Sequence, residues 1–217
     1  MRKPEFLAFA GLDDRTDLDR VHELSCRYPL EWGWLWSLGR DGDPRYPSSM
    51  IIDRLKMYEG EVSFAIHLCG NEARRFNQGE MLPNLRIFDR IQVNLNDDIY
   101  DPHQLDLWAD ILDKPIIQQW RQIEFPEARG PLRHFLYDVS GGRGKMPDAL
   151  PVATEGYLVG FAGGITPENA VYFNSMVQGD NPYYLDMESG IRTDNWLDLD
   201  KCEAVCKAIY GDQEYPQ

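Results

Sequence analysis

The sequence predicts a single α/β domain, a (β/α)8 TIM barrel spanning residues 1–217. Eight short apolar runs alternate with helical patterns or loops along the chain, and this order favours a parallel sheet with crossover helices. Several of the runs are continuously apolar, which is typical of strands covered on both faces. No linker or shift in composition divides the chain. An open doubly wound sheet is the alternative, and eight strands favour the barrel.

The expected strands are the apolar runs at residues 6–11, 32–38, 63–69, 90–95, 114–120, 134–140, 157–163 and 183–188. Helical spacing of apolar residues predicts helices at residues 16–26, 48–58, 101–112, 166–177 and 198–210. Proline at position 102 fits a first helical turn, and Thr166 is the expected N-cap of the fourth helix. Residues 121–133 contain two prolines and a glycine, so we expect the helix after strand five to be missing or eroded.

Composition excludes several classes of function. The formal net charge of −14 repels nucleic acid and anionic membranes, so neither is an expected partner. No apolar run approaches the roughly 20 residues that span a bilayer, and we expect a cytoplasmic protein that is a monomer or a homodimer. The four cysteines form no metal-binding pattern. We expect no metal, and Cys202 and Cys206 are expected to be buried as small hydrophobic residues.

Two glycine-bearing turns follow the last two expected strands, at residues 161–169 and 185–190. In a (β/α)8 barrel this is where phosphate commonly binds, because glycine lets the backbone approach a ligand closely and exposed amides meet its oxygens. The sequence therefore predicts a phosphate site at Gly163, Gly164, Ser189 and Gly190. The alternative is that these glycines only make tight turns between strand and helix.

The sixth expected strand ends at Asp138, and a loop with the sequence Ser140-Gly141-Gly142-Arg143-Gly144-Lys145 follows. A carboxylate at a strand end suits general acid or base catalysis. We expect Gly142 and Gly144 to join the phosphate site and Arg143 to bring positive charge over a bound anion. The alternative is an ordinary surface loop whose aspartate caps its own turn.

Three tryptophans, Trp32, Trp34 and Trp36, alternate in the second expected strand and share one face. If that face points into the barrel, Trp36 is the member that stacks on a planar ring of the ligand. If the face points outward, all three pack beneath helices.

These segments together resemble phosphoribosylanthranilate isomerase, a (β/α)8 enzyme of tryptophan synthesis, over almost the whole chain. Residues 162–169, AGGITPEN, are similar to the AGGLTPEN turn of that family. Residues 186–191, DMESGI, resemble its DVSSGVE turn, and residues 141–145 resemble its GGSGK loop. Residues 44–48, PRYPS, resemble its PRYVS segment, and residues 92–94, QVN, stand where it has QLH.

The resemblance implies an Amadori rearrangement of a phosphoribosyl amine without a cofactor. It implies that Asp138 is the general acid that opens the furanose ring and that Arg45 holds a carboxylate of the substrate. The glycine turns would hold the phosphate, and Asn94 would line the substrate pocket in place of a histidine.

Two departures bear on activity. The general base of the family is a cysteine in a KICG motif on strand one, where this chain has Ala10. Asp13, Asp14 or Cys69 are the candidates to replace it. The loop after Asp138 is also shorter than in the family.

Three functions fit these observations. The first is an aldose–ketose isomerase, an intramolecular oxidoreductase, acting on a phosphoribosyl-linked substrate with an altered base. The second is a non-catalytic protein that binds or sequesters a nucleotide-derived phosphorylated metabolite. The third is a structural or interaction module on an inherited barrel, which would be indifferent to such ligands.

Overall fold

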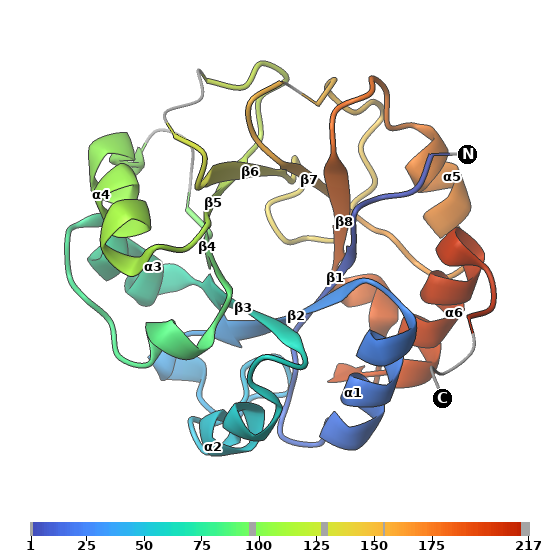
Figure 1. Ribbon diagram of the computed structural model, residues 1–217, viewed down its shortest axis with the longest axis horizontal. Coiled ribbons are helices and arrows are strands. Elements are labelled where there is room, and N and C mark those ends of the chain that lie inside the picture. The colour runs from blue at the N-terminus through green and yellow to red at the C-terminus, as the bar shows by residue number, and fades with distance from the viewer. Residues whose placement is uncertain (1, 96–98, 127–129, 154, 214–217) are drawn as a thin grey trace.

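Eight parallel strands form a closed barrel in the computed structural model, which describes residues 2–95, 99–126, 130–153 and 155–213. The strands are β1 (Leu7–Ala10), β2 (Leu30–Trp36), β3 (Ser63–Leu68), β4 (Arg90–Val93), β5 (Ile116–Trp120), β6 (Arg133–Tyr137), β7 (Val159–Ala162) and β8 (Tyr183–Met187). Pairing of β1 with β8, in the register Leu7↔Leu185, closes the ring (Figure 1). The predicted (β/α)8 TIM barrel is confirmed, and the open sheet is excluded.

Six α-helices surround the barrel within the described residues: α1 (Leu18–Arg27), α2 (Ile51–Leu55), α3 (Gly70–Asn77), α4 (Pro102–Leu112), α5 (Ala170–Ser175) and α6 (Leu199–Tyr210). The short α2 continues into a 3₁₀ helix, Lys56–Tyr58. Between β8 and α6 lie another 3₁₀ helix, Ser189–Ile191, and a hairpin of β9 (Arg192–Thr193) and β10 (Trp196–Leu197). Over the described part of the chain, no helix is long and apolar enough to cross a membrane.

Helix starts follow the capping chemistry of the sequence, with one exception. Asp17, Asp101 and Asp198 each cap a helix by accepting hydrogen bonds from two amides of its first turn. The expected threonine cap was wrong, because α5 begins at Ala170 after Asn169. The Asn169 side chain binds the turn instead, since it accepts from the Thr166 amide at 2.8 Å and donates to the Gly164 carbonyl at 2.8 Å.

The helix expected to be missing after β5 is absent from the described residues between β5 and β6, and the described residues between β6 and β7 also contain none. Figure 1 shows loops where helices would cover this side of the barrel. Aromatic side chains cover the outer face of the strands on this side instead. Phe135 of β6 packs against Phe125 and Tyr157 of the two loops, with ring centroids 5.7 and 4.8 Å apart. The Tyr157 hydroxyl also donates to the Pro126 carbonyl, which joins the loops.

The lower interior of the barrel holds a buried ion pair. Arg90 lies 3.4 Å from Glu31, and both side chains are less than 10% exposed. The Arg90 guanidinium also stacks over the rings of Phe6 and Tyr184, 4.8 and 4.5 Å from their centroids. Gly160 makes room for this layer, because a Cβ there would lie 2.2 Å from the Tyr184 ring. The floor of the barrel is therefore closed, and any ligand cavity must lie above it.

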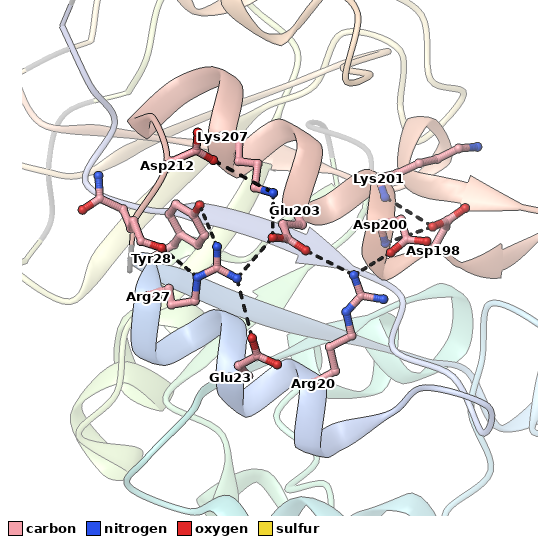
Figure 2. A network of polar contacts seen from close by, with 11 residues as sticks. Arg20, Glu23, Arg27, Tyr28, Asp198, Asp200, Lys201, Glu203, Lys207 and Asp212 are labelled. Carbon is pink, nitrogen blue, oxygen red and sulfur yellow. Dashed lines mark hydrogen bonds and ion pairs between the residues drawn. The ribbon is translucent and has the colours of Figure 1, made fainter. Parts of the chain in front are cut away.

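A polar network joins the first helix to the last. Glu203 of α6 binds Arg20 and Arg27 of α1 at 3.2 and 3.1 Å, and Lys207 of its own helix at 3.0 Å. Figure 2 shows Glu203 between these cations. Because α1 and α6 flank the β1–β8 seam, the network supports barrel closure from outside.

Replacing Glu203 by Gln should lower the free energy of unfolding by about 1 kcal/mol at neutral pH, because partly exposed ion pairs contribute about 0.2–1 kcal/mol each. Hydrogen bonding from Lys207, and from the two arginines, lowers the pKa of Glu203. Its stabilisation is therefore present above the pKa of the unfolded chain and lost as pH falls through the lowered folded value. Urea unfolding of both proteins across this pH range measures the difference, which should vanish in acid.

The matched control is Asp200→Asn. Asp200 also contacts Arg20, but its side chain is 83% exposed, so the substitution should change stability much less. Equal losses for the two variants, or a Glu203→Gln loss that persists in acid, would show that the network does not stabilise the closure electrostatically.

Candidate active site at the C-terminal end of the barrel

Two adjoining cavities lie at the end of the barrel where the strands finish. The inner cavity, about 70 Å³, is lined by interior-facing strand residues and by the turns after β6, β7 and β8. The outer cavity, about 700 Å³, extends over the loops after β2, β3 and β5. Leu35, Asn94, Gln119, Gly142 and Glu188 line both cavities. Together they form a pocket deep and wide enough for a small phosphorylated molecule.

All the residues predicted to bind phosphate line the inner cavity: Gly142, Gly144, Gly163, Gly164, Ser189 and Gly190. The three segments that carry them touch through their backbones. A Cβ on Gly190 would lie 1.9 Å from the Ile165 carbonyl oxygen, and one on Gly164 would lie 2.7 Å from that of Gly144. Only glycine permits this approach.

Several main-chain amides of the turns have no partner. Within the described part of the chain, the N–H groups of Gly164, Ser189 and Gly190 donate no hydrogen bond. Free amides beside a cavity leave donors for a ligand, and oriented backbone N–H groups are a common anion-binding device.

Asp138 lies at the end of β6, is 5% exposed, and lines the inner cavity. Its Oδ1 accepts hydrogen bonds from the Ser140 amide and hydroxyl at 3.1 and 2.7 Å. Its Oδ2 accepts from the Gln119 side chain at 3.0 Å and the Gly142 amide at 2.6 Å. Gly142 therefore has two roles, because its amide helps to fix the Asp138 carboxylate and its backbone forms part of the cavity wall.

Arg45 lines the outer cavity, where a carboxylate of the protein already engages it. Its Nη1 lies 3.1 Å from Glu188 Oε1, and its Nε donates to Asn195 Oδ1 at 2.7 Å. Burial raises the pKa of Glu188, while the charges of Arg45 and Arg192 oppose the rise. A ligand carboxylate at Arg45 would therefore compete with Glu188.

Asn94 lines both cavities and belongs to a chain of polar side chains from β3 and β4. Gln92 Nε2 donates to Asn94 Oδ1 at 3.1 Å and lies 3.2 Å from His67 Nδ1. Burial, and then the charge of Arg90, lowers the pKa of His67 to about 3, so the imidazole is neutral at physiological pH. Asn94 Nδ2 also contacts Cys69 Sγ at 3.5 Å.

Two predicted site residues lie elsewhere. Trp36 faces outward, stacks on Trp34 with centroids 6.0 Å apart, and lines neither cavity. The three tryptophans thus pack beneath helices, while the opposite face of β2 presents Gly33 and Leu35 to the interior. Arg143 lines a separate groove on the outside of the β6 loop and donates to the Ser140 carbonyl at 2.8 Å.

None of the sequence candidates for the missing base lies in the inner cavity, which Ala10 lines with its methyl group. Asp13 is buried and accepts hydrogen bonds from the Leu197 and Arg15 amides. Asp14 accepts from the Ser48 amide and hydroxyl. Cys69 lines only the outer cavity, and burial raises its pKa to about 11.

Sequence reasoning missed a carboxylate that does line the inner cavity, Asp186 of β8. It is 5% exposed. Burial, and then the nearby negative charges of Asp138 and Glu188, raise its pKa well above the usual range. The signal was present in the sequence, because an acidic side chain inside an otherwise apolar strand is costly unless it has a function. No group of three or more acidic, histidine or cysteine side chains suited to a metal occurs among the described residues.

No family model matches the sequence. A stretch of 111 residues is 32% identical to the multifunctional tryptophan biosynthesis protein of Schizosaccharomyces pombe, and it covers 47% of this chain and 14% of that protein. The solved phosphoribosyl anthranilate isomerase of Thermotoga maritima has a TM-score of 0.61 at 15% identity, over 95% of this chain and 100% of that one. The 3-hexulose-6-phosphate synthase of Salmonella typhimurium has a TM-score of 0.52 at 12% identity, over 94% and 98%.

The fold and the site define a (β/α)8 barrel with glycine turns after its last strands. By fold the chain is phosphoribosylanthranilate isomerase-like. In the resemblance drawn from the sequence, Ala10 stands where that family has a cysteine.

Gly190→Ala should separate the turns after β7 and β8, because its Cβ would lie 1.9 Å from the Ile165 carbonyl. We expect a loss of about 1–3 kcal/mol in the free energy of unfolding, the usual range for overpacking. Thermal and urea unfolding measure the loss. Gly39→Ala is the control, because its Cβ would meet nothing within 4 Å. Wild-type stability of Gly190→Ala would contradict the close packing of the turns.

Proposed function

We propose that this protein binds a phosphorylated sugar of the phosphoribosyl type and catalyses its aldose–ketose rearrangement in the cytoplasm. The observation that carries the proposal is the set of partnerless amides at Gly164, Ser189 and Gly190 on one cavity with Asp138. Amides of this kind suit a phosphate, and a carboxylate beside them suits proton transfer to the attached sugar.

The charges in the wall of the outer cavity favour an anionic ligand, although the net charge of the chain is −14. Four arginines line it: Arg40, Arg45, Arg74 and Arg121. The acidic residues lining the same cavity are Asp43 and Glu188, so four positive side chains face two negative ones. The cavity is thus locally cationic, and the charges on the rest of the surface are largely screened beyond a Debye length of about 8–10 Å.

In this proposal Asp138 is the acid that opens a furanose ring, the role implied by the family resemblance. A protonated Asp138 keeps its contacts, because the Ser140 hydroxyl at 2.7 Å can accept a hydrogen bond as well as donate one. The Gln119 and Gly142 donors fix the other oxygen. The rearrangement is an isomerisation, so it consumes no oxidant or reductant.

A second candidate is a binding protein without catalysis, which would sequester or carry a nucleotide-derived phosphorylated metabolite. Two observations favour it. Ala10 cannot transfer a proton, and Arg45 is engaged by Glu188 at 3.1 Å. Both candidates require the same phosphate site, so binding and turnover must be measured separately.

Wild-type protein should bind ribose 5-phosphate in isothermal titration calorimetry. Ser189→Asp should weaken binding at least about tenfold, because a carboxylate beside a phosphate is repelled. Ser175→Asp, at an exposed site at the end of α5, is the control and should leave the affinity unchanged. No heat with ribose 5-phosphate or inorganic phosphate would contradict both candidate functions.

Wild-type protein should also convert phosphoribosylanthranilate to its ketose isomer, quantified by chromatography. Asp138→Asn should lower kcat by about 10²–10⁴-fold, the usual contribution of an acid or base, while ribose 5-phosphate still binds. Binding without turnover would favour the sequestering protein. An unchanged kcat in Asp138→Asn would remove Asp138 from the mechanism.

A further inference from the structure

The side of the inner cavity next to β1 lacks the thiol that the family resemblance requires, and it contains a different ionisable group. Asp186 pairs in register with Ala8 of β1 and Ala162 of β7. Both neighbours are alanines, and Ala10 lines the same cavity. The Asp186 side chain therefore lies among methyl groups beside the end of β1, on the side where the cysteine of the family would stand.

The carboxylates of Asp186 and Asp138 are equally buried but differently held. Each is 5% exposed. Asp138 accepts four hydrogen bonds, whereas no side chain or amide of the described residues donates to the Asp186 carboxylate. A buried polar group without a partner is costly, and this one lines the ligand cavity. The oxygens of Asp186 are therefore free to accept a hydrogen bond or a proton from a ligand, whereas those of Asp138 already accept hydrogen bonds from the protein.

We propose that Asp186 is the general base of this protein and transfers the proton between the two sugar carbons in place of the absent thiol. The inference rests on the isomerase function proposed above. The two carboxylic groups of the cavity then carry out different proton transfers: Asp138 acts on the ring oxygen, and Asp186 acts on the sugar carbons.

The proton steps balance. Asp138 gives its proton to the ring oxygen as the bond from C1 to that oxygen breaks, and the nitrogen lone pair forms a C1=N iminium. Asp186 takes the proton of C2, the C–H electron pair forms a C1=C2 double bond, and the iminium π pair returns to nitrogen. Asp186 then returns the proton to C1, while the enol hydroxyl at C2 gives its proton to Asp138. Both carboxyl groups end as they began.

The charges around Asp186 suit a base. Burial and the negative charges of Asp138, Glu188 and Glu31 raise its pKa well above the usual range, and Arg90 below opposes the rise. A carboxylate with a raised pKa accepts a proton from carbon more readily than an ordinary one.

The other ionisable groups of the cavity are less suited to this role. His67 has a pKa of about 3, which makes it a weak base, and its Nδ1 lies against Gln92. Glu188 is paired with Arg45. Cys69 has a pKa of about 11 and lines only the outer cavity.

The decisive variant is Asp186→Asn, compared with wild type and with Asp13→Asn, which alters a buried carboxylate outside the cavity. We expect kcat for phosphoribosylanthranilate to fall by about 10²–10⁴-fold in Asp186→Asn and to stay within about twofold in Asp13→Asn. Ribose 5-phosphate should bind Asp186→Asn at least as tightly as wild type, because a negative charge has been removed, and this shows that the site is intact.

The pH profile separates a base from a structural residue. Wild-type kcat should fall as pH decreases through the raised pKa of Asp186, because the protonated form cannot accept a proton. The residual activity of Asp186→Asn should lack this limb. Adding Ala10→Cys to Asp186→Asn should restore part of the rate by supplying a thiol from β1.

Two results would overturn the inference, and they differ. If wild type converts phosphoribosylanthranilate and Asp186→Asn matches it in kcat and pH profile, Asp186 is not the general base, but the proposed isomerase function is kept. If wild type binds ribose 5-phosphate but shows no turnover, the isomerase and the base fall together, and the binding protein remains.

Discussion

Backbone contact among the loops after β6, β7 and β8 is the constraint on which the site depends. Gly190 lies against the Ile165 carbonyl and Gly164 against that of Gly144, at separations that no side chain permits. This contact brings partnerless amides from two turns to one small cavity. In the function proposed above, the same contact lets a chain of charge −14 hold an anion. Net charge acts at long range and is screened over about 10 Å, whereas amide dipoles act at contact. At the cavity, the attraction of the backbone amides for an anion therefore exceeds the repulsion from the net negative charge.

The barrel interior contains two levels of charged side chains, and they differ in how far each charge is neutralised by its neighbours. In the lower level Glu31 faces Arg90, and the guanidinium lies close to the rings of Phe6 and Tyr184. A buried pair of this kind adds little to stability, but its charges are balanced. In the upper level Asp138 and Asp186 face a cavity, and within the described residues only Asp138 has hydrogen-bond donors. Buried negative charge without compensation opposes folding, and such a departure from local consistency is typical of a functional site. The interior therefore separates a closed structural floor from an upper level whose carboxylic groups line the cavity.

Sequence patterns predicted the features that depend on local periodicity and on turn chemistry. The eight apolar runs predicted the barrel, and the two glycine turns together with the glycine loop after Asp138 placed six residues on the inner cavity. Features that depend on tertiary packing were missed. The helix α3 has few apolar residues beyond Ala73 and Phe76, and the orientation of Trp36 depends on which face of β2 turns inward. An acidic residue in an apolar strand could have drawn attention to Asp186, but its proposed role as a base could not be inferred from the sequence. That role depends on the absence of hydrogen-bond donors among the described residues around a buried carboxylate. That absence exists only once the strands are assembled.

The cavity wall beside Ala10 is packed, and this bears on the base proposed above. Gly33 pairs with Ala10 across the first two strands, and a Cβ on Gly33 would lie 2.8 Å from His67 Nε2. The imidazole therefore occupies the space that a side chain on β2 would need, and the wall beside Ala10 is packed. Here the glycine contacts, the fixed Asp138 and the partnerless Asp186 occur together around a packed wall. This combination is what the proposed isomerase requires, because Asp138 is held in place as the acid and Asp186 is left available as the base.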